Sequence, residues 1–262
     1  MLNYEVFGEG GVPLLVVHGL FGSARNLGVI ARRLADSRRV VVVDQRNHGD
    51  SPWFDNHTYP DMAADLAEVI KAEMPEGCLV LGHSMGGKAG MTLALTRPEL
   101  VKGLVVGDIA PVAYGHSQMA LVDAMRSLDL SQIETRRDAD RLLSEAVSED
   151  GVRAFLLQSL DIKQRRWRLN LDVLAKEMST VVGWDAEATA GRTYEGPTLF
   201  LSGADSDYVT REGRNAGKAY FPNARFFKIP GTGHWLHAEK PRDFEATVDA
   251  FLSAPDPSAD RS

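Results

Sequence analysis

The feature that most limits the possible folds of this chain is a serine, Ser84, with a glycine two residues before it, Gly82, and another two residues after it, Gly86. An apolar run at residues 78–81 precedes it, and a longer apolar segment at residues 88–96 follows it. The first is typical of a buried strand and the second of a helix. We therefore predict a sharp strand-to-helix turn, in which the glycines let the chain pass while the serine adopts a strained backbone.

Strand-like and helix-like segments alternate on both sides of this turn. The predicted strands are residues 2–7, 13–17, 39–43, 78–81, 104–106, 197–201 and 225–229. The predicted helices are residues 26–34, 59–74, 88–96, 211–220 and 241–252. Such alternation indicates a parallel sheet with helices on both faces, and strands that are apolar throughout indicate burial on both sides. We therefore predict an α/β fold with a doubly wound, mostly parallel sheet and an edge strand at residues 2–7.

The alternation stops in the middle of the chain. We predict no strand between residues 112 and 196, and the helix-like segments there are residues 118–128, 138–147, 152–160 and 171–182. The prediction is a helical cap, residues 112–196, inserted into a core made of residues 1–111 and 197–252. Residues 253–262 are small and polar and contain proline, so we predict a disordered tail.

A serine hydroxyl needs a general base, usually a histidine, before it can act as a nucleophile. His234 lies in a glycine-rich loop, residues 231–237, directly after a predicted strand. This position is the carboxyl end of the sheet, on the same rim as Ser84, where ligands of open α/β sheets bind. We therefore predict that His234 is the general base for Ser84.

The other histidines have a weaker case for a catalytic role. His83 precedes Ser84 and is predicted to pack inside the turn. His48, His57 and His116 lie on predicted loops and lack the paired spacing of a zinc site. The sequence therefore predicts no metal and no cofactor.

A second glycine-containing loop, residues 18–23, follows the predicted strand at residues 13–17. Acyl transfer passes through a tetrahedral intermediate, whose oxyanion needs hydrogen-bond donors. One donor would be the amide of Met85, at the start of the helix after the serine. The other would be the amide of Leu20 in the second loop, with that of Phe21 as the alternative.

Several motifs together resemble the α/β-hydrolase fold family. They are His18-Gly19, Asp44-x-Arg46-x-x-Gly49-x-Ser51, Gly82-His83-Ser84-Met85-Gly86-Gly87 and Gly233-His234-Trp235. His18-Gly-Leu-Phe-Gly-Ser23, Arg46-Asn-His-Gly49 and Ser84-Met-Gly-Gly-Lys88 further resemble a subfamily of small bacterial esterases with carboxylesterase and acyl-CoA thioesterase activity. The resemblance covers nearly the whole chain outside the predicted cap, and it implies a serine hydrolase with a Ser-His-Asp triad.

The acid of such a triad has more than one candidate. In most of the superfamily it lies after the cap, in a Gly-x-x-Asp-x-x-Val loop. Residues 203–209 match the glycine and the valine, but Ser206 stands at the acid position, between Asp205 and Asp207. Asp108 ends the strand that follows the serine's own, and the esterases that this sequence resembles are similar there. We favour Asp108, with Ser206 assisting the histidine through a hydrogen bond, and keep Asp205 and Asp207 as alternatives.

The predicted cap would supply the substrate pocket. The residues predicted to line it are Phe21, Met119, Phe155, Trp184 and Tyr208. The predicted function is hydrolysis of carboxylic esters, with acyl-CoA thioesters as a further substrate class. The same residues could instead act on a carbon–carbon bond, an enol-lactone or a peracid substrate. A more remote alternative is a non-catalytic ligand receptor on the same fold.

Composition narrows the choice of partners. The formal net charge is −7 and there is no long basic run, so we predict no nucleic-acid partner. The single cysteine, Cys78, cannot form an intramolecular disulfide and favours a reducing compartment. Residues 1–10 lack a cationic start followed by an apolar run, so we expect no signal peptide there. The sequence has no apolar stretch of the roughly 20 residues that span a bilayer. We therefore predict a cytoplasmic protein with a small-molecule substrate and no membrane partner; the sequence does not indicate an oligomeric state.

Overall fold

The computed structural model describes residues 1–254, and its centre is a seven-stranded sheet in the order β1-β3-β2-β4-β5-β8-β9. The strands are β1 Tyr4–Phe7, β2 Leu14–Val17, β3 Val40–Val43, β4 Cys78–His83, β5 Val101–Gly107, β8 Thr198–Gly203 and β9 Ala224–Ile229. All neighbours are parallel except β1, which pairs antiparallel with β3 at the edge. The predicted doubly wound, mostly parallel sheet is therefore confirmed. The predicted tail, apart from Ser253 and Ala254, lies outside the described residues.

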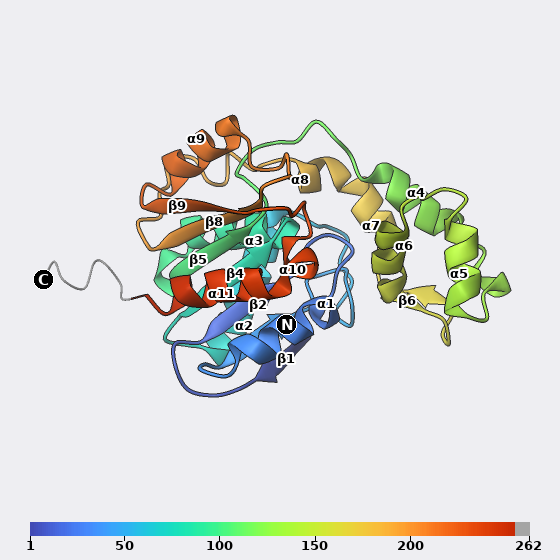
Figure 1. Ribbon diagram of the computed structural model, residues 1–262, viewed down its shortest axis with the longest axis horizontal. Coiled ribbons are helices and arrows are strands. Elements are labelled where there is room, and N and C mark those ends of the chain that lie inside the picture. Colours follow the sequence, from blue (N-terminus) through green and yellow to red (C-terminus); the bar gives the residue numbers. More distant parts are fainter. Residues whose placement is uncertain (255–262) are drawn as a thin grey trace, which may run out of the picture.

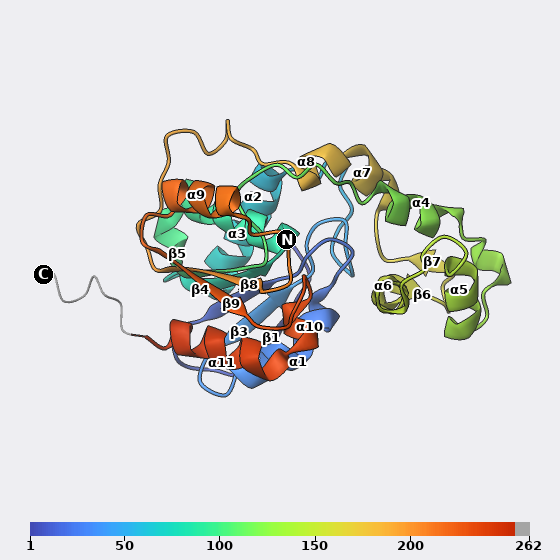
Figure 2. The same cartoon turned by 45° about the horizontal axis from the view of Figure 1, so that its top comes forward.

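Helices cover both faces of the sheet (Figures 1 and 2). On one face lie α1 Ala24–Leu34 and α11 Pro241–Leu252, and on the other lie α2 Tyr59–Glu73, α3 Met85–Thr96 and α9 Arg211–Tyr220. A short helix, α10 Leu236–Glu239, leads into α11, and a 3₁₀ turn, Pro98–Leu100, follows α3. Within residues 1–254, no helix is long and apolar enough to cross a membrane.

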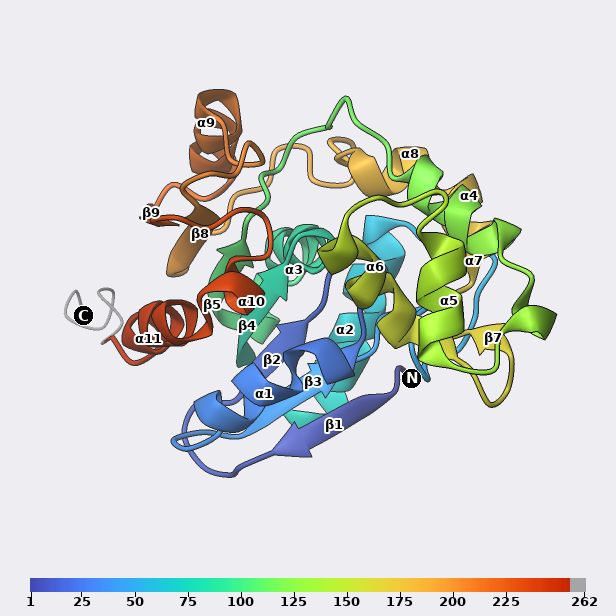
Figure 3. The same cartoon turned by 45° about the vertical axis from the view of Figure 1, so that its right-hand side comes forward.

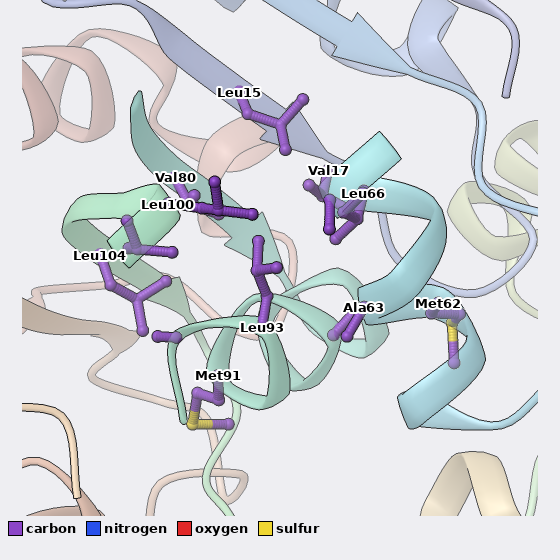
Figure 4. Packing of buried hydrophobic residues seen from close by; sticks show 14 of the residues in the cluster. Leu15, Val17, Met62, Ala63, Leu66, Val80, Met91, Leu93, Leu100 and Leu104 are labelled. Atoms are coloured by element: carbon purple, nitrogen blue, oxygen red, sulfur yellow. The ribbon is translucent and has the colours of Figure 1, made fainter. Parts of the chain in front are cut away.

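Burial on both faces explains why the central strands are apolar at every position. All of β2 and β3 is inaccessible to solvent. Leu15 and Val17 pack with Leu66 and Leu93 of α2 and α3, as Figure 4 shows, whereas Leu14 packs toward α1 and α11. The edge strands β1 and β9 contain charged residues and are not apolar throughout, and both are only partly buried.

The predicted cap is a separate lobe with its own hydrophobic cluster (Figures 1 and 3). Its helices are α4 Met119–Ser127, α5 Arg136–Leu143, α6 Asp150–Leu156, α7 Leu171–Lys176 and α8 Met178–Val182. Tyr194 lies within the predicted cap, but it packs in the core cluster, where its hydroxyl donates to the carbonyl of Val101 at 2.9 Å. The chain has therefore returned to the core before residue 196.

The prediction that this lobe contains no strand is wrong. A two-stranded antiparallel pair, β6 Leu160–Asp161 and β7 Arg166–Trp167, stands where the sequence predicted the end of a helix and a loop. Helix α6 ends at Leu156, and a 3₁₀ turn, Leu157–Ser159, leads into β6; a further turn, Leu130–Gln132, follows α4. Two-residue strands are too short to show alternation in a sequence, so tertiary contacts decide their position. One such contact runs from the Trp167 indole N–H to the carbonyl of Met125 at 2.9 Å.

Candidate active site

Ser84 lies in a strained turn between β4 and α3. Its backbone has φ 53° and ψ −121°, and its amide donates to the carbonyl of Gly107 at 2.8 Å. A Cβ on Gly82 would lie 2.2 Å from the carbonyl oxygen of Gly86, and one on Gly86 would lie 2.4 Å from that of Val17. Real Cβ atoms do not approach an oxygen so closely, so both positions require glycine. The turn predicted from the G-x-S-x-G spacing is present.

His234 connects Ser84 to a buried carboxylate. It lies on the loop between β9 and α10, and its Nε2 is 3.1 Å from Oγ of Ser84. Its Nδ1 is 2.7 Å from Oδ2 of Asp108, a residue that solvent does not reach. Since a carboxylate only accepts, Nδ1 carries the proton, and Nε2 is left to accept from the serine hydroxyl. The ring of Tyr208 stacks on the imidazole with 3.9 Å between centroids and holds its plane.

Asp108 is the carboxylate that the structure brings to His234. It has φ 49° at the end of β5, and its Oδ1 accepts from the amide of Gly203 at 3.1 Å. Ser206 was expected to bond to the histidine; instead its hydroxyl donates to Oδ2 of Asp108 at 2.5 Å. Asp205 and Asp207, the alternative acids, are exposed, and neither bonds to His234 within residues 1–254. The later loop therefore supplies a hydroxyl that bonds to the carboxylate at the end of the earlier strand.

Two backbone amides near Ser84 have no acceptor in the described structure, namely those of Leu20 and Met85. The amide of Phe21, the alternative to Leu20, already donates to Nε2 of His48 at 3.2 Å. The loop that carries Leu20 runs against the serine, since a Cβ on Gly19 would lie 3.2 Å from Cβ of Ser84. The arrangement therefore favours Leu20 over Phe21 as the second free donor.

A pocket opens above Ser84 between the core and the cap and, with its mouth, encloses about 910 Å³. Of the predicted lining residues, Phe21, Phe155 and Tyr208 line it. The prediction is wrong for Met119, which lies against the hydrophobic cluster of the cap, and for Trp184, which packs edge-on against Tyr220. Further apolar lining comes from Leu20, Leu27, Ile109, Leu121, Val152, Leu156, Val181 and Val182.

Comparison with known proteins agrees with this geometry. Residues 12–241 match the sequence model of the alpha/beta hydrolase fold family. The chain belongs to the α/β-hydrolase fold family. This confirms the resemblance inferred from the motifs around His18, Arg46, Ser84 and His234.

The similar proteins include esterases and a lipase. This α/β hydrolase is 40% identical to esterase YbfF of Escherichia coli over 244 residues, which cover 92% of this chain and 93% of the relative. It is 39% identical to the mouse (Mus musculus) sn-1-specific diacylglycerol lipase ABHD11, with 96% of this chain and 85% of that protein covered. The solved structure of a marine microorganism esterase superimposes with a TM-score of 0.90 at 38% identity, covering 96% of this chain and 99% of that one. These relatives support ester hydrolysis as the activity of this hydrolase.

Sequence reasoning missed a row of buried histidines in this α/β hydrolase. The rings of His18 and His48 are 5.2 Å apart, and those of His48 and His57 are 5.3 Å apart. His48 and His57 were expected on loops with no setting comparable to that of His234, yet both are inaccessible to solvent. His48 bonds to the Phe21 amide, and His57 lies 3.3 Å from the sulfur of Met85. The Arg46-Asn-His-Gly49 motif could have revealed the position of His48. It follows the strand at residues 39–43, as the loop at residues 18–23 follows the strand at residues 13–17, so both loops lie at the same edge of the sheet.

Lys88 is a second residue whose place the sequence did not reveal. It lies in α3 with 1% of its surface exposed, and its ammonium group donates to the carbonyls of Val182, at 3.1 Å, and Gly183. It also lies 4.7 Å from the centre of the Tyr114 ring. Burial lowers the pKa of Lys88 to about 7. Its contacts join the core helix to the end of the last cap helix.

The buried histidines predict a loss of stability in acid. Burial lowers the pKa of His57 to about 3 and that of His237 to about 4, and it also lowers the pKa values of His18, His48 and His83. Below about pH 6.5 the unfolded chain binds protons that the folded chain does not, so the free energy of unfolding falls as the pH falls toward 4. Each such histidine contributes a slope of up to about 1.4 kcal/mol per pH unit.

Urea unfolding of wild type and His57→Gln between pH 7 and 4 checks this expectation. The variant should be less stable at pH 7 but lose stability less steeply on acidification, because it lacks one of the protons taken up on unfolding. Equal slopes for the two proteins would show that His57 takes up its proton over the same pH range in the folded and unfolded chains, and would contradict the account.

Proposed function

We propose that this α/β hydrolase cleaves carboxylic esters through an acyl-enzyme on Ser84. The observation that carries the proposal is the continuous series of hydrogen bonds from Ser84 through His234 to Asp108, with distances of 3.1 and 2.7 Å, at the floor of an apolar pocket. A serine, a neutral imidazole and a buried carboxylate in this order form the standard apparatus of acyl transfer.

In the acylation step, Oγ of Ser84 attacks the ester carbonyl carbon, and its proton passes to Nε2 of His234. The imidazolium that forms is stabilised by the carboxylate of Asp108 across the 2.7 Å bond. The amides of Leu20 and Met85 donate to the oxyanion of the tetrahedral intermediate. The intermediate collapses when the carbon–oxygen bond to the alcohol breaks and His234 returns the proton to the leaving alkoxide.

Deacylation repeats these events with water in place of the serine. His234 takes a proton from a water molecule, and the resulting hydroxide attacks the acyl carbon. The second tetrahedral intermediate uses the same amide donors. Its collapse releases the carboxylic acid, and the proton on His234 returns to Oγ of Ser84. The cycle consumes one ester and one water, yields one acid and one alcohol, and needs no cofactor.

The pocket favours uncharged oxygen esters with an apolar acyl group. Apart from the buried Lys88, no lysine or arginine lines it among the described residues, whereas the phosphates of coenzyme A call for exposed cations. Similarity to a diacylglycerol lipase and to esterases also supports a neutral ester substrate. We therefore place acyl-CoA thioesters second to oxygen esters.

A substrate panel tests this order. We expect kcat/KM to rise about tenfold from p-nitrophenyl acetate to the butyrate, because burial of each added methylene contributes about 0.8 kcal/mol. Butyryl-CoA should be a poorer substrate than p-nitrophenyl butyrate. Phe155→Ala should reduce the gain from chain length, whereas Ser144→Ala, on the exposed surface of the cap, should not. Absence of turnover with every ester would contradict the proposal, and a preference for the acyl-CoA would reverse the order of the two substrate classes.

A further inference from the structure

The backbone of Phe21 is held by side chains from two different parts of the molecule. Phe21 adopts a left-handed conformation, with φ of 63°, and is buried. Its amide donates to Nε2 of His48 at 3.2 Å, and its carbonyl accepts from Oγ of Ser159 at 2.8 Å. A residue with a side chain is strained in this conformation and persists there only where its surroundings hold it.

The ring of His48 can accept the Phe21 amide in one tautomer only. Its Nδ1 lies 2.9 Å from the carbonyl oxygen of Arg46, which can only accept, so Nδ1 carries the proton. Nε2 is then unprotonated and can accept. Full burial lowers the pKa of His48 well below its usual range, which keeps the ring in this neutral form.

The cap fixes the same loop from the opposite side. Ser159 lies directly before β6 and is itself buried. Directly after β7, the carbonyl of Arg168 accepts from the amide of Gly49 at 2.8 Å, and Leu169 forms an antiparallel bridge with His48. The β6–β7 segment of the cap therefore contacts both the Phe21 carbonyl and the loop that carries His48.

We propose that His48 is a positioning residue for the oxyanion hole and that Ser159 couples the cap to it. The proposal rests on the proposed function, in which the amide of Leu20 is an oxyanion donor. The Phe21 amide belongs to the peptide between Leu20 and Phe21, so the bond to His48 fixes the torsions of Leu20 and with them the direction of its own amide. Without His48 or Ser159 the strained Phe21 can relax, and the Leu20 amide then moves away from the oxyanion.

Variants of the full chain test this role. For each variant, kcat and KM are measured with p-nitrophenyl butyrate, and the midpoint of thermal unfolding is recorded. The inhibition constant Ki is measured with an alkyl trifluoromethyl ketone, which forms a hemiketal oxyanion on the serine. Loss of a whole oxyanion donor lowers kcat by about 10²–10³. His48→Leu only displaces one donor, the Leu20 amide, so we expect it to lower kcat by about 10–100-fold. KM should change by less than about threefold, and Ki should rise by the factor by which kcat/KM falls.

Two further variants separate positioning from general stability. His48→Gln retains an acceptor near the position of Nε2 and should recover most of the activity. Ser159→Ala should lower kcat about 3–10-fold with the same rise in Ki, since one of the two contacts remains. The matched control is Ser127→Ala, which removes a cap hydroxyl that donates to the carbonyl of Ala124 and does not touch Phe21. It should leave kcat and Ki unchanged.

The outcomes distinguish this inference from the function on which it rests. If wild type hydrolyses no ester, the proposed function has failed and the inference with it. If wild type is active but folded His48→Leu and Ser159→Ala retain its kcat and Ki, only the inference is overturned. A fall in kcat without a rise in Ki also overturns it, because the oxyanion donors are then intact. If His48→Leu does not fold, Ser159→Ala and His48→Gln decide the question by the same measurements.

Discussion

Replacement of Ser84 by alanine is expected to abolish ester hydrolysis. The Oγ atom of Ser84 is the only nucleophile within hydrogen-bonding distance of His234 in the described structure, at 3.1 Å. Removal of the serine from the triad of a serine protease lowers kcat by about 10⁶. We expect a loss of the same order here, measured as the initial rate with p-nitrophenyl butyrate. Binding of substrate should persist, because the pocket and the two free amides remain.

Ser144→Ala is the control for the Ser84 variant. It removes a hydroxyl from the exposed surface of the cap, where Oγ of Ser144 donates to the carbonyl of Arg141. Its activity should equal that of wild type. Substantial turnover by Ser84→Ala, at a fold stability equal to that of wild type, would remove Ser84 from the mechanism.

Replacement of Asp108 by asparagine should have the second largest effect. Oδ2 of Asp108 accepts from both His234 and Ser206, and an asparagine amide at that position would donate instead. The imidazole would then be held in the tautomer that carries its proton on Nε2, which cannot accept from the serine. The same replacement in a protease triad lowers kcat by about 10⁴, and we expect a loss of that order with KM little changed.

The later loop supplies the controls for Asp108. Asp205→Asn and Asp207→Asn change exposed carboxylates that do not bond to His234 within residues 1–254, so each should alter kcat by less than about twofold. A large loss in either of these variants, together with a mild effect of Asp108→Asn, would move the acid to the later loop.

Features that depend on local chain geometry could be predicted from the sequence. The strand-to-helix turn at Ser84 was predicted because such a turn leaves no room for a Cβ at Gly82 and Gly86, and the spacing of these glycines around the serine is visible in the sequence. The approach of His234 and Asp108 to Ser84 was predicted because the ends of parallel strands share one rim of the sheet. The structure brings these three side chains together, and the roles assigned to them remain predictions for the variants above.

Features that depend on packing between distant segments could not be predicted in this way. Ser206 lies in the predicted loop, but its hydroxyl bonds to Asp108 and not to His234, because of how that loop packs against the end of β5. The burial of His48 depends on contact between two loops and the cap, which no periodicity in the sequence reveals. Trp184 was predicted in the pocket because it is apolar and lies beside Gly183, near the end of the predicted cap, yet in the structure it packs against Tyr220 in the core.

Reaction with a fluorophosphonate tests the central claim most directly, because this reagent phosphonylates an activated serine without the need for a matching substrate. We expect the intact mass of the folded protein to increase by one adduct, with the modified peptide containing Ser84. Ser84→Ala should remain unmodified under the same conditions. A folded wild-type protein that takes up no adduct, or one whose adduct persists in Ser84→Ala, would contradict the account and favour a non-catalytic ligand receptor on this fold.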